Sequence, residues 1–164
     1  MTMRDRRFVA VHRDGPLDRE SHAILALWAA DCAEKVLHFF KKASDDLRPK
    51  RAIETGRAWA VGKVKTGVAM KASLAAHAAA RSVKEPSAIA AARAAGQAVA
   101  TAHFADHCMG ALLYALKIRK LSGQPVGREL KLQTSKLPLR LRRMVRDGVV
   151  SRLRKLGVKS VEKF

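Results

Sequence analysis

Residues 87–100 read SAIAAARAAGQAVA, a stretch in which alanine fills eight of fourteen positions. Alanine has the highest intrinsic helix propensity, and its small side chain lets neighbouring helices approach closely. The stretch opens the longest helical pattern in the chain, which runs to about residue 120, although Gly96 and Gly110 each weaken a helix by roughly 1 kcal/mol relative to alanine. Close packing of a neighbouring helix, or a break, would explain these glycines. We therefore expect either a bend near Ala105 and Asp106 or two consecutive helices.

Helical spacing of apolar residues continues on both sides of this stretch. We expect earlier helices over residues 18–42, 49–62 and 66–82, and a final helix that begins at Pro138 and ends at Gly157. No sustained alternation of apolar and polar residues indicates a strand. The sequence thus predicts an all-α fold, a compact bundle of five to six helices with a basic C-terminal helix. Its expected parts are a loosely held N-terminal arm over 1–17, a helical core over 18–121, a loop over 122–137, and a basic amphipathic helix and tail over 138–164 that pack on the same domain.

The composition fits one domain in a reducing compartment. A length of 164 residues suits a single domain. Hydrophobic residues make up 48% and aromatic residues 5%, so Ala, Leu, Val and Ile must fill the core. Cys32 and Cys108 form no CxxC pair and sit in apolar helical patterns, which favours buried, reduced thiols. Nothing reads as a signal peptide or approaches the length of a membrane span. These features predict a cytoplasmic protein.

The formal net charge of +19 is concentrated near the C-terminus. Residues 117–164 hold 15 Lys and Arg against 3 Asp and Glu, so this segment carries +12 of the total. A positive potential of this size fits three kinds of partner: nucleic acid, an anionic membrane surface or an acidic protein.

The basic side chains of the last expected helix form the candidate anion or partner surface: Arg140, Arg142, Arg143, Arg146, Arg152, Arg154 and Lys155. Such a helix can neutralise phosphates, lie on a membrane surface or simply present a solvated face above the core. No aromatic residues accompany the basic ones, which disfavours stacking of single-stranded nucleic acid.

The candidate metal ligands are His77, His103, His107 and Asp31. His103 and His107 are four residues apart and therefore share one helix face, while His77 and Asp31 lie in other expected helices. Two such histidines with a carboxylate from a second helix would suit zinc. However, Phe104 stands where the zincin motif needs Glu. We therefore favour a structural role, in which buried neutral imidazoles bond carboxylates or carbonyls and fix the register of the helices.

Other catalytic patterns are incomplete. Asp31 and Glu34 are one turn apart and could perform acid–base chemistry, but an ion-pair network with Arg57, Arg81 and Arg93 is the favoured interpretation. The segment 62–67 lacks the spacing of a phosphate loop, and no GxSxG motif is present. We expect no enzyme activity and no cofactor.

Several strings in the first three quarters of the chain form a recognisable set. They are LWAADCAEKVL at residues 27–37, RAIE at 51–54, RAWA at 57–60, AHAAAR at 76–81, AAGQAVATAH at 94–103, and then His107, Gly110 and Tyr114–Ala115. Together they resemble the putative immunity proteins, the immunity-five-like domains of bacterial polymorphic-toxin systems. The resemblance covers about residues 17–121, while Phe104, Asp106 and Cys108 depart from it.

The resemblance implies an all-α fold and a protein that neutralises a toxin by binding it, and it carries over no catalytic residue. Because a basic nuclease site would repel a protein of charge +19, the target should be acidic. The leading hypothesis is therefore a non-enzymatic binding protein that occludes a protein partner. Alternatives are a nucleic-acid-binding accessory protein that uses the C-terminal helix, and a metal protein or enzyme built on His77, His103 and His107. Helices with small-residue faces often associate, so a homodimer is also among the expectations.

Overall fold

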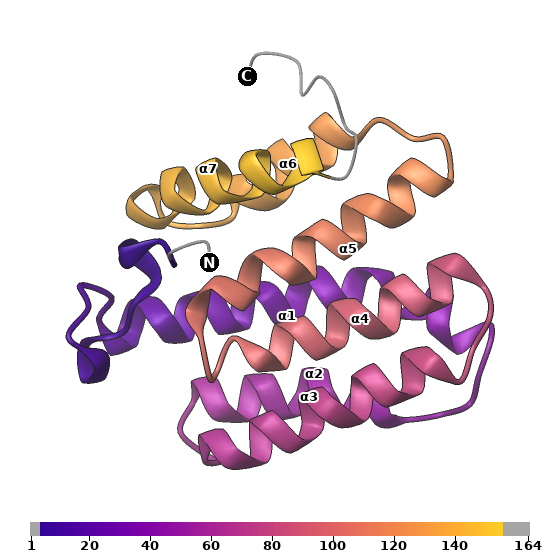
Figure 1. Ribbon diagram of the computed structural model, residues 1–164, viewed down its shortest axis with the longest axis horizontal. Coiled ribbons are helices and arrows are strands. Elements are labelled where there is room, and N and C mark those ends of the chain that lie inside the picture. Colours follow the sequence, from indigo (N-terminus) through magenta and orange to yellow (C-terminus); the bar gives the residue numbers. More distant parts are fainter. Residues whose placement is uncertain (1–3, 156–164) are drawn as a thin grey trace.

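The computed structural model describes the backbone of residues 4–155 and the side chains of residues 4–153, and within this range it confirms the all-α prediction (Figure 1). The described chain contains seven α-helices, three short 3₁₀ turns and no strand. The helices are α1 (Arg19–Lys41), α2 (Arg48–Ala60), α3 (Thr66–Arg81), α4 (Pro86–Ala100), α5 (Cys108–Leu121), α6 (Val126–Ser135) and α7 (Leu139–Lys155). No helix in the described range is both long and apolar enough for a membrane span.

The alanine-rich helix α4 forms the centre of the molecule. It packs against α1, α2, α3 and α5, and ten of its fifteen residues are buried. In Figure 1, α2 and α3 lie on one side of α1 and α4, while α5, α6 and α7 lie on the other. Alanine side chains permit this arrangement because four neighbouring helices must approach one short helix.

Two glycines leave space that side chains of a facing helix fill, which agrees with the packing explanation that their sequence context offered. A Cβ atom on Gly96 of α4 would lie 2.8 Å from Cε1 of His77 on α3. A Cβ atom on Gly110 of α5 would lie 2.6 Å from Oε1 of Gln97 on α4. The side chains of His77 and Gln97 thus occupy the space that each glycine leaves on the facing helix.

Local capping signals explain where the helices begin and end. Asp18 accepts a hydrogen bond of 2.7 Å from the backbone N–H of Ser21 at the start of α1. Glu85 caps α4 in the same way through the N–H of Ala88, and Pro86 occupies the first turn. After α2, Gly62 adopts a φ of 76°, a conformation that glycine reaches without strain.

Of the two alternatives for the long helical pattern, the structure has two consecutive helices. α4 ends at Ala100, the short 3₁₀ turn η3 (Ala105–His107) follows, and α5 begins at Cys108. The buried Thr101 caps the end of α4 and Ala105 is buried in η3, so the break lies inside the packed structure.

The predicted loop over residues 122–137 is wrong for residues 126–135, which form α6. Trp28 of α1 donates from Nε1 to the backbone oxygen of Gln133 at 2.9 Å and helps to hold this helix on the core. Leu130 is fully buried. The expected end of the last helix at Gly157 lies outside the described residues.

The N-terminal arm is not loosely held over residues 4–17. Phe8 and Leu17 are buried. The guanidinium groups of Arg4 and Arg13 lie 3.6 Å and 4.1 Å from the centre of the Phe104 ring. Arg4 also pairs with Asp106 at 3.1 Å. The arm therefore packs on the segment that joins α4 to α5.

Candidate functional site

Helix α7 presents one apolar face and one basic face. Leu141, Val145, Val149 and Leu153 recur every four residues and are buried, so they fix the orientation of the helix on the core. Residues displaced by about 100° to 180° around the helix must then face outward. The sequence placed seven basic residues on this helix, and the structure separates those it describes into two groups.

Arg140 and Arg152 are turned towards the rest of the protein. Arg140 donates from Nη1 to Oγ of Ser21 at 2.6 Å and pairs with Asp18 at 3.5 Å, which links the start of α7 to the start of α1. Arg152 donates from Nη1 to the sulfur of Met109 at 2.9 Å, and its Nη2 atom lies 3.8 Å from Asp106. Both side chains attach α7 to its neighbours.

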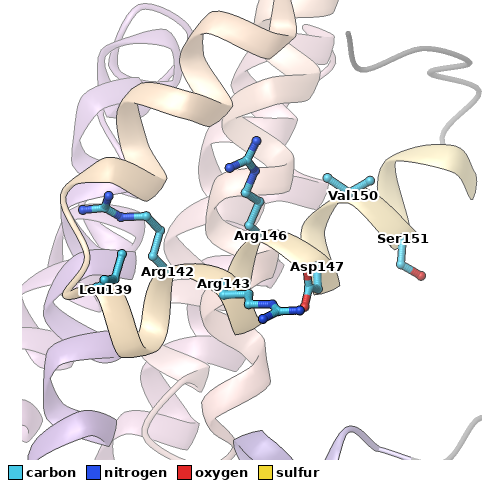
Figure 2. Close-up of a pocket in the computed structure, with 7 residues that line it drawn as sticks. All are labelled: Leu139, Arg142, Arg143, Arg146, Asp147, Val150 and Ser151. Carbon is cyan, nitrogen blue, oxygen red and sulfur yellow. The ribbon is translucent and has the colours of Figure 1, made fainter. Parts of the chain in front are cut away.

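The second group forms what we call the cationic face: Arg142, Arg143 and Arg146. These three side chains line a hollow of about 710 Å³ along the outer side of α7, together with Leu139, Asp147, Val150 and Ser151 (Figure 2). Arg143 is exposed, while Arg142 and Arg146 are half-buried. The side chains of Arg154 and Lys155 lie outside the described residues.

Fixed contacts orient part of the cationic face. Arg142 donates from Nη2 to the backbone oxygens of Ser135 and Leu137, at 2.8 Å and 3.2 Å. Asp147, the one carboxylate among the lining residues, pairs with Arg7 of the N-terminal arm at 3.1 Å. Three guanidinium groups therefore border the hollow, and the described carboxylate beside them is paired with a fourth.

This arrangement is suited to binding anions. Guanidinium groups are planar, remain charged at all physiological pH values and bond carboxylates or phosphates through paired N–H donors. The described lining residues of the hollow also include Ser151, whose hydroxyl can donate to the same anion. These groups can recognise an anion electrostatically.

The candidate metal ligands are not brought together. No group of three or more His, Cys, Asp or Glu side chains that could hold a metal ion occurs in the described part of the chain. Burial lowers the pKa of His77, His103 and His107, which favours their neutral forms. His77 accepts from Arg93 at 3.3 Å, and Nδ1 of His107 pairs with Oε1 of Gln97 at 2.8 Å.

The expected role of these histidines is therefore only partly correct. Their side chains are half-buried rather than fully buried. His107 bonds the side-chain carbonyl oxygen of Gln97, as expected, whereas His77 meets an arginine. A fully buried imidazole of the expected kind is His22, which is 3% exposed and bonds the backbone oxygen of Thr101 from Nε2 at 2.6 Å. Its position at the start of α1 offers no sequence signal for this contact.

The carboxylate pair on α1 belongs to a surface ion-pair network. Arg57 of α2 donates to Asp31 at 2.8 Å and also pairs with Glu34. All three side chains are substantially exposed. Arg93 lies at His77 instead of at this pair. Asp31 therefore faces Arg57 and not the histidines with which it was grouped as a candidate metal ligand.

Glu129 of α6 is a site residue that sequence reasoning missed. Its side chain is 3% exposed, and its carboxylate accepts hydrogen bonds from Lys35 of α1 and Arg119 of α5. These bonds hold the pKa of Glu129 at about 2 in spite of its burial. Glu129 also lines a cavity between the three helices. The spacing of Val126, Glu129, Leu130 and Gln133 on one helix face was the available signal.

Comparison with known proteins identifies the family of the chain. The sequence model of the Imm-5 like putative immunity proteins matches residues 15–140, which include α1 to α6 and the first two residues of α7. No significant match was found among curated proteins or among solved structures. The family match covers well over half of the 164 residues and extends the resemblance seen in the helical core. The chain belongs to the Imm-5 like putative immunity protein family.

Proposed function

We propose that this protein is a non-enzymatic binding protein that neutralises a toxin by occluding it, and that the cationic face of α7 contacts an acidic surface of that partner. Membership of an immunity-type family supports a protein partner. The excess of basic over acidic residues favours a partner of opposite charge.

The proposal rests on the division of the α7 arginines into those that line the hollow and those that do not. Arg140 and Arg152 do not line the hollow, whereas Arg142, Arg143 and Arg146 border it together, and Arg142 does so while bonded to Ser135 and Leu137. Arg142 is held in place by two backbone oxygens, so less side-chain entropy is lost when it meets a partner.

Nucleic acid is the second candidate, because the same guanidinium groups bind phosphates. Two features of the hollow favour a protein. Asp147 lies among the arginines and would repel a run of phosphates, although Arg7 reduces this repulsion. None of the described lining residues is aromatic, so this part of the hollow offers no ring on which a base could stack.

Charge reversal on the cationic face tests the proposal. The test variant is R143E/R146E, and the matched control is K63E/K71E. Both control lysines are exposed; Lys71 lies in α3 and Lys63 lies in the turn before it. Both double variants change the net charge by the same amount. Tagged wild-type protein and both variants are used to capture proteins from a lysate of cells that produce the cognate toxin, with quantification by mass spectrometry. A growth assay then tests whether each variant protects against that toxin.

We expect the α7 variant to lose at least tenfold in capture and to lose protection, while the control keeps both. Equal losses in the two variants would mean that net charge alone matters and would refute the proposed surface. Recovery of nucleic acid alone, with an affinity that falls steeply with salt concentration, would favour the second candidate.

A further inference from the structure

A second concave site lies between α1, α5 and α6, away from the hollow on α7. It is a cavity of about 250 Å³ with apolar walls formed by Val36 and Phe39 of α1 and by Ala115 and Ile118 of α5. Polar side chains gather at one part of its lining, among them Lys35, Arg119 and Glu129. Cavities with apolar walls and a few convergent polar groups are the usual form of small-molecule sites.

The carboxylate in this cavity is not available to a ligand. Oε1 of Glu129 accepts from Nζ of Lys35 at 2.5 Å and from Nε2 of Gln133 at 2.7 Å. Oε2 accepts from Nε and Nη2 of Arg119 at 3.1 Å and 2.8 Å. With four donors on two oxygens, the carboxylate has little capacity to bind a cationic ligand.

The cations around the cavity outnumber this single carboxylate. Lys35 and Arg119 are the basic side chains of the described lining, in which Glu129 is the one carboxylate. The Lys35 ammonium carries three N–H groups, of which the hydrogen bond to Glu129 uses one. Lys35 is 44% exposed and Arg119 is 32% exposed, so both can also reach a ligand. The cavity therefore has a net positive lining and spare donors beside its apolar walls.

We propose that this cavity binds a small organic monocarboxylate with an apolar body. The ligand carboxylate meets Lys35 and Arg119, and the apolar body lies against Phe39 and Ile118. The size fits, because a cavity of about 150 Å³ holds a benzene molecule, and 250 Å³ admits an aromatic acid or a linear acid of roughly six to eight carbons. The same chemistry occurs in a free metabolite and at the C-terminus of a peptide with an apolar last residue.

Ligand titrations followed by ¹⁵N–¹H correlation spectra of the full chain test the proposal. The probes are hexanoate and benzoate, with hexan-1-ol, hexylamine and acetate as controls. We expect the two apolar acids to shift signals from residues 35–39 and 115–122 and to saturate below about 10 mM. The uncharged, cationic and body-free controls should bind at least tenfold more weakly. Equal binding of hexan-1-ol or acetate would overturn the proposed recognition of both halves of the ligand.

Variants localise the binding. A115L places extra side-chain volume in the cavity and should abolish the shifts caused by hexanoate. K35Q removes a cation assigned to the ligand carboxylate and should weaken hexanoate at least threefold, while K41Q, an exposed lysine outside the cavity lining, should not change it. If A115L does not fold, this lysine pair still decides the outcome. Identical affinities in K35Q and K41Q, or shifts spread over the whole chain, would overturn the proposal.

Two further experiments are needed. One distinguishes a free acid from a peptide C-terminus as the ligand, and the other distinguishes this cavity from the hollow on α7. An N-acetylated tripeptide ending in leucine is compared with its C-terminal amide and with hexanoate. Tighter binding of the peptide acid than of hexanoate assigns the cavity to a peptide C-terminus. Tighter binding of hexanoate assigns the cavity to a free acid. If neither compound binds, the proposal is refuted. The R143E/R146E variant should bind hexanoate like wild type, so failure of the α7 surface leaves this proposal untouched.

Discussion

At the scale of single residues, Gly96 gives the sharpest prediction. Substitution by alanine improves helix propensity by up to about 1 kcal/mol, yet the new methyl group would lie 2.8 Å from the His77 ring. The ring sits between α3 and α4, and overpacking of a core contact costs about 1 to 3 kcal/mol. We expect G96A to lower the free energy of unfolding by about 1 kcal/mol in urea denaturation. In the H77A background the same substitution should become neutral or stabilising; an undiminished loss there would contradict the steric explanation.

Glu129 predicts a pH-dependent contribution to stability. Its pKa of about 2 in the folded protein lies below the ordinary value of 4.5. A depressed carboxyl pKa stabilises the fold above pH 4.5, and this contribution is lost as the pH falls from 4.5 towards 2. E129Q removes the charge but keeps the shape, and Lys35 and Arg119 can still turn to water.

We therefore expect E129Q to lose about 2 kcal/mol of stability at pH 7 in urea denaturation. Between pH 5 and pH 3, the stability of the variant should fall less than that of wild type. Parallel pH profiles for the two proteins would show that the carboxylate does not make this contribution.

The residue scale also shows what the sequence could and could not reveal about the candidate site. The sequence predicted the last helix from its apolar spacing, and the buried residues Leu141, Val145, Val149 and Leu153 follow that spacing. The inward role of Arg152 depends on Met109 and Asp106, which are about 45 positions earlier in the chain. Periodicity reports which side of a helix is apolar, but it carries no information on which distant polar group meets a given arginine.

At the scale of the helix, the same separation predicts that α7 arginines differ in their effect on stability. Arg152 contacts the Met109 sulfur and the largely buried Asp106, whereas Arg143 is exposed on the cationic face. R152A should destabilise the protein by about 1 to 2 kcal/mol, and R143A should stay within about 0.5 kcal/mol of wild type. Chemical denaturation of both variants measures this difference. Equal effects would mean that Arg152 does not help to attach α7.

Helix α6 explains where prediction from pattern failed. The other helices have apolar stripes or alanine-rich faces, and their positions were anticipated to within a few residues. The buried side of α6 instead includes Glu129, Gln133 and Thr134, which satisfy one another, Lys35 and the backbone. Gly123 and Pro125 before it are typical loop residues. A helix that buries polar groups in specific hydrogen bonds lacks the apolar period on which the prediction depended.

At the scale of the whole molecule, buried histidines predict a loss of stability in mild acid. Burial lowers the pKa of His22 and also of His77, His103 and His107 below the ordinary value of 6.5. The unfolded chain then binds protons before the folded protein does, so stability falls as the pH drops below 6.5. Each histidine adds up to about 1.4 kcal/mol per pH unit in this window.

His22 should make a large part of this effect because it is the most buried of the four. H22N should be less stable than wild type at pH 7.5, because the contact with Thr101 and the ring contact with Trp59 are weakened. Between pH 7 and pH 5.5, however, its stability should decline less steeply. A thermal denaturation series over this range measures both slopes, and a slope equal to that of wild type would assign the acid sensitivity elsewhere.

The charge of the whole protein predicts an unusual response to salt. Even if every Asp and Glu were paired, 33 basic and 14 acidic residues leave 19 uncompensated cations, so repulsion outweighs the attraction of the surface ion pairs. Raising NaCl from 0.01 M to 0.1 M shortens the Debye length from about 30 Å to about 10 Å. We therefore expect the Tm to rise with NaCl over this range, whereas a protein held by surface ion pairs would lose stability.

The position of the charge can be tested with the same double variants. R143E/R146E and K63E/K71E both reduce the net charge from +19 to +15, but only the first acts within residues 117–164, which carry +12. Repulsion depends on local charge density, so at 0.01 M NaCl the α7 variant should gain more in Tm than the control and should respond less to added salt. Differential scanning fluorimetry at several NaCl concentrations measures both effects. A Tm that falls with salt, or a larger gain in Tm in the control, would show that repulsion within the C-terminal segment does not limit stability. The arginines of the cationic face would then repel one another no more than basic residues elsewhere on the surface do.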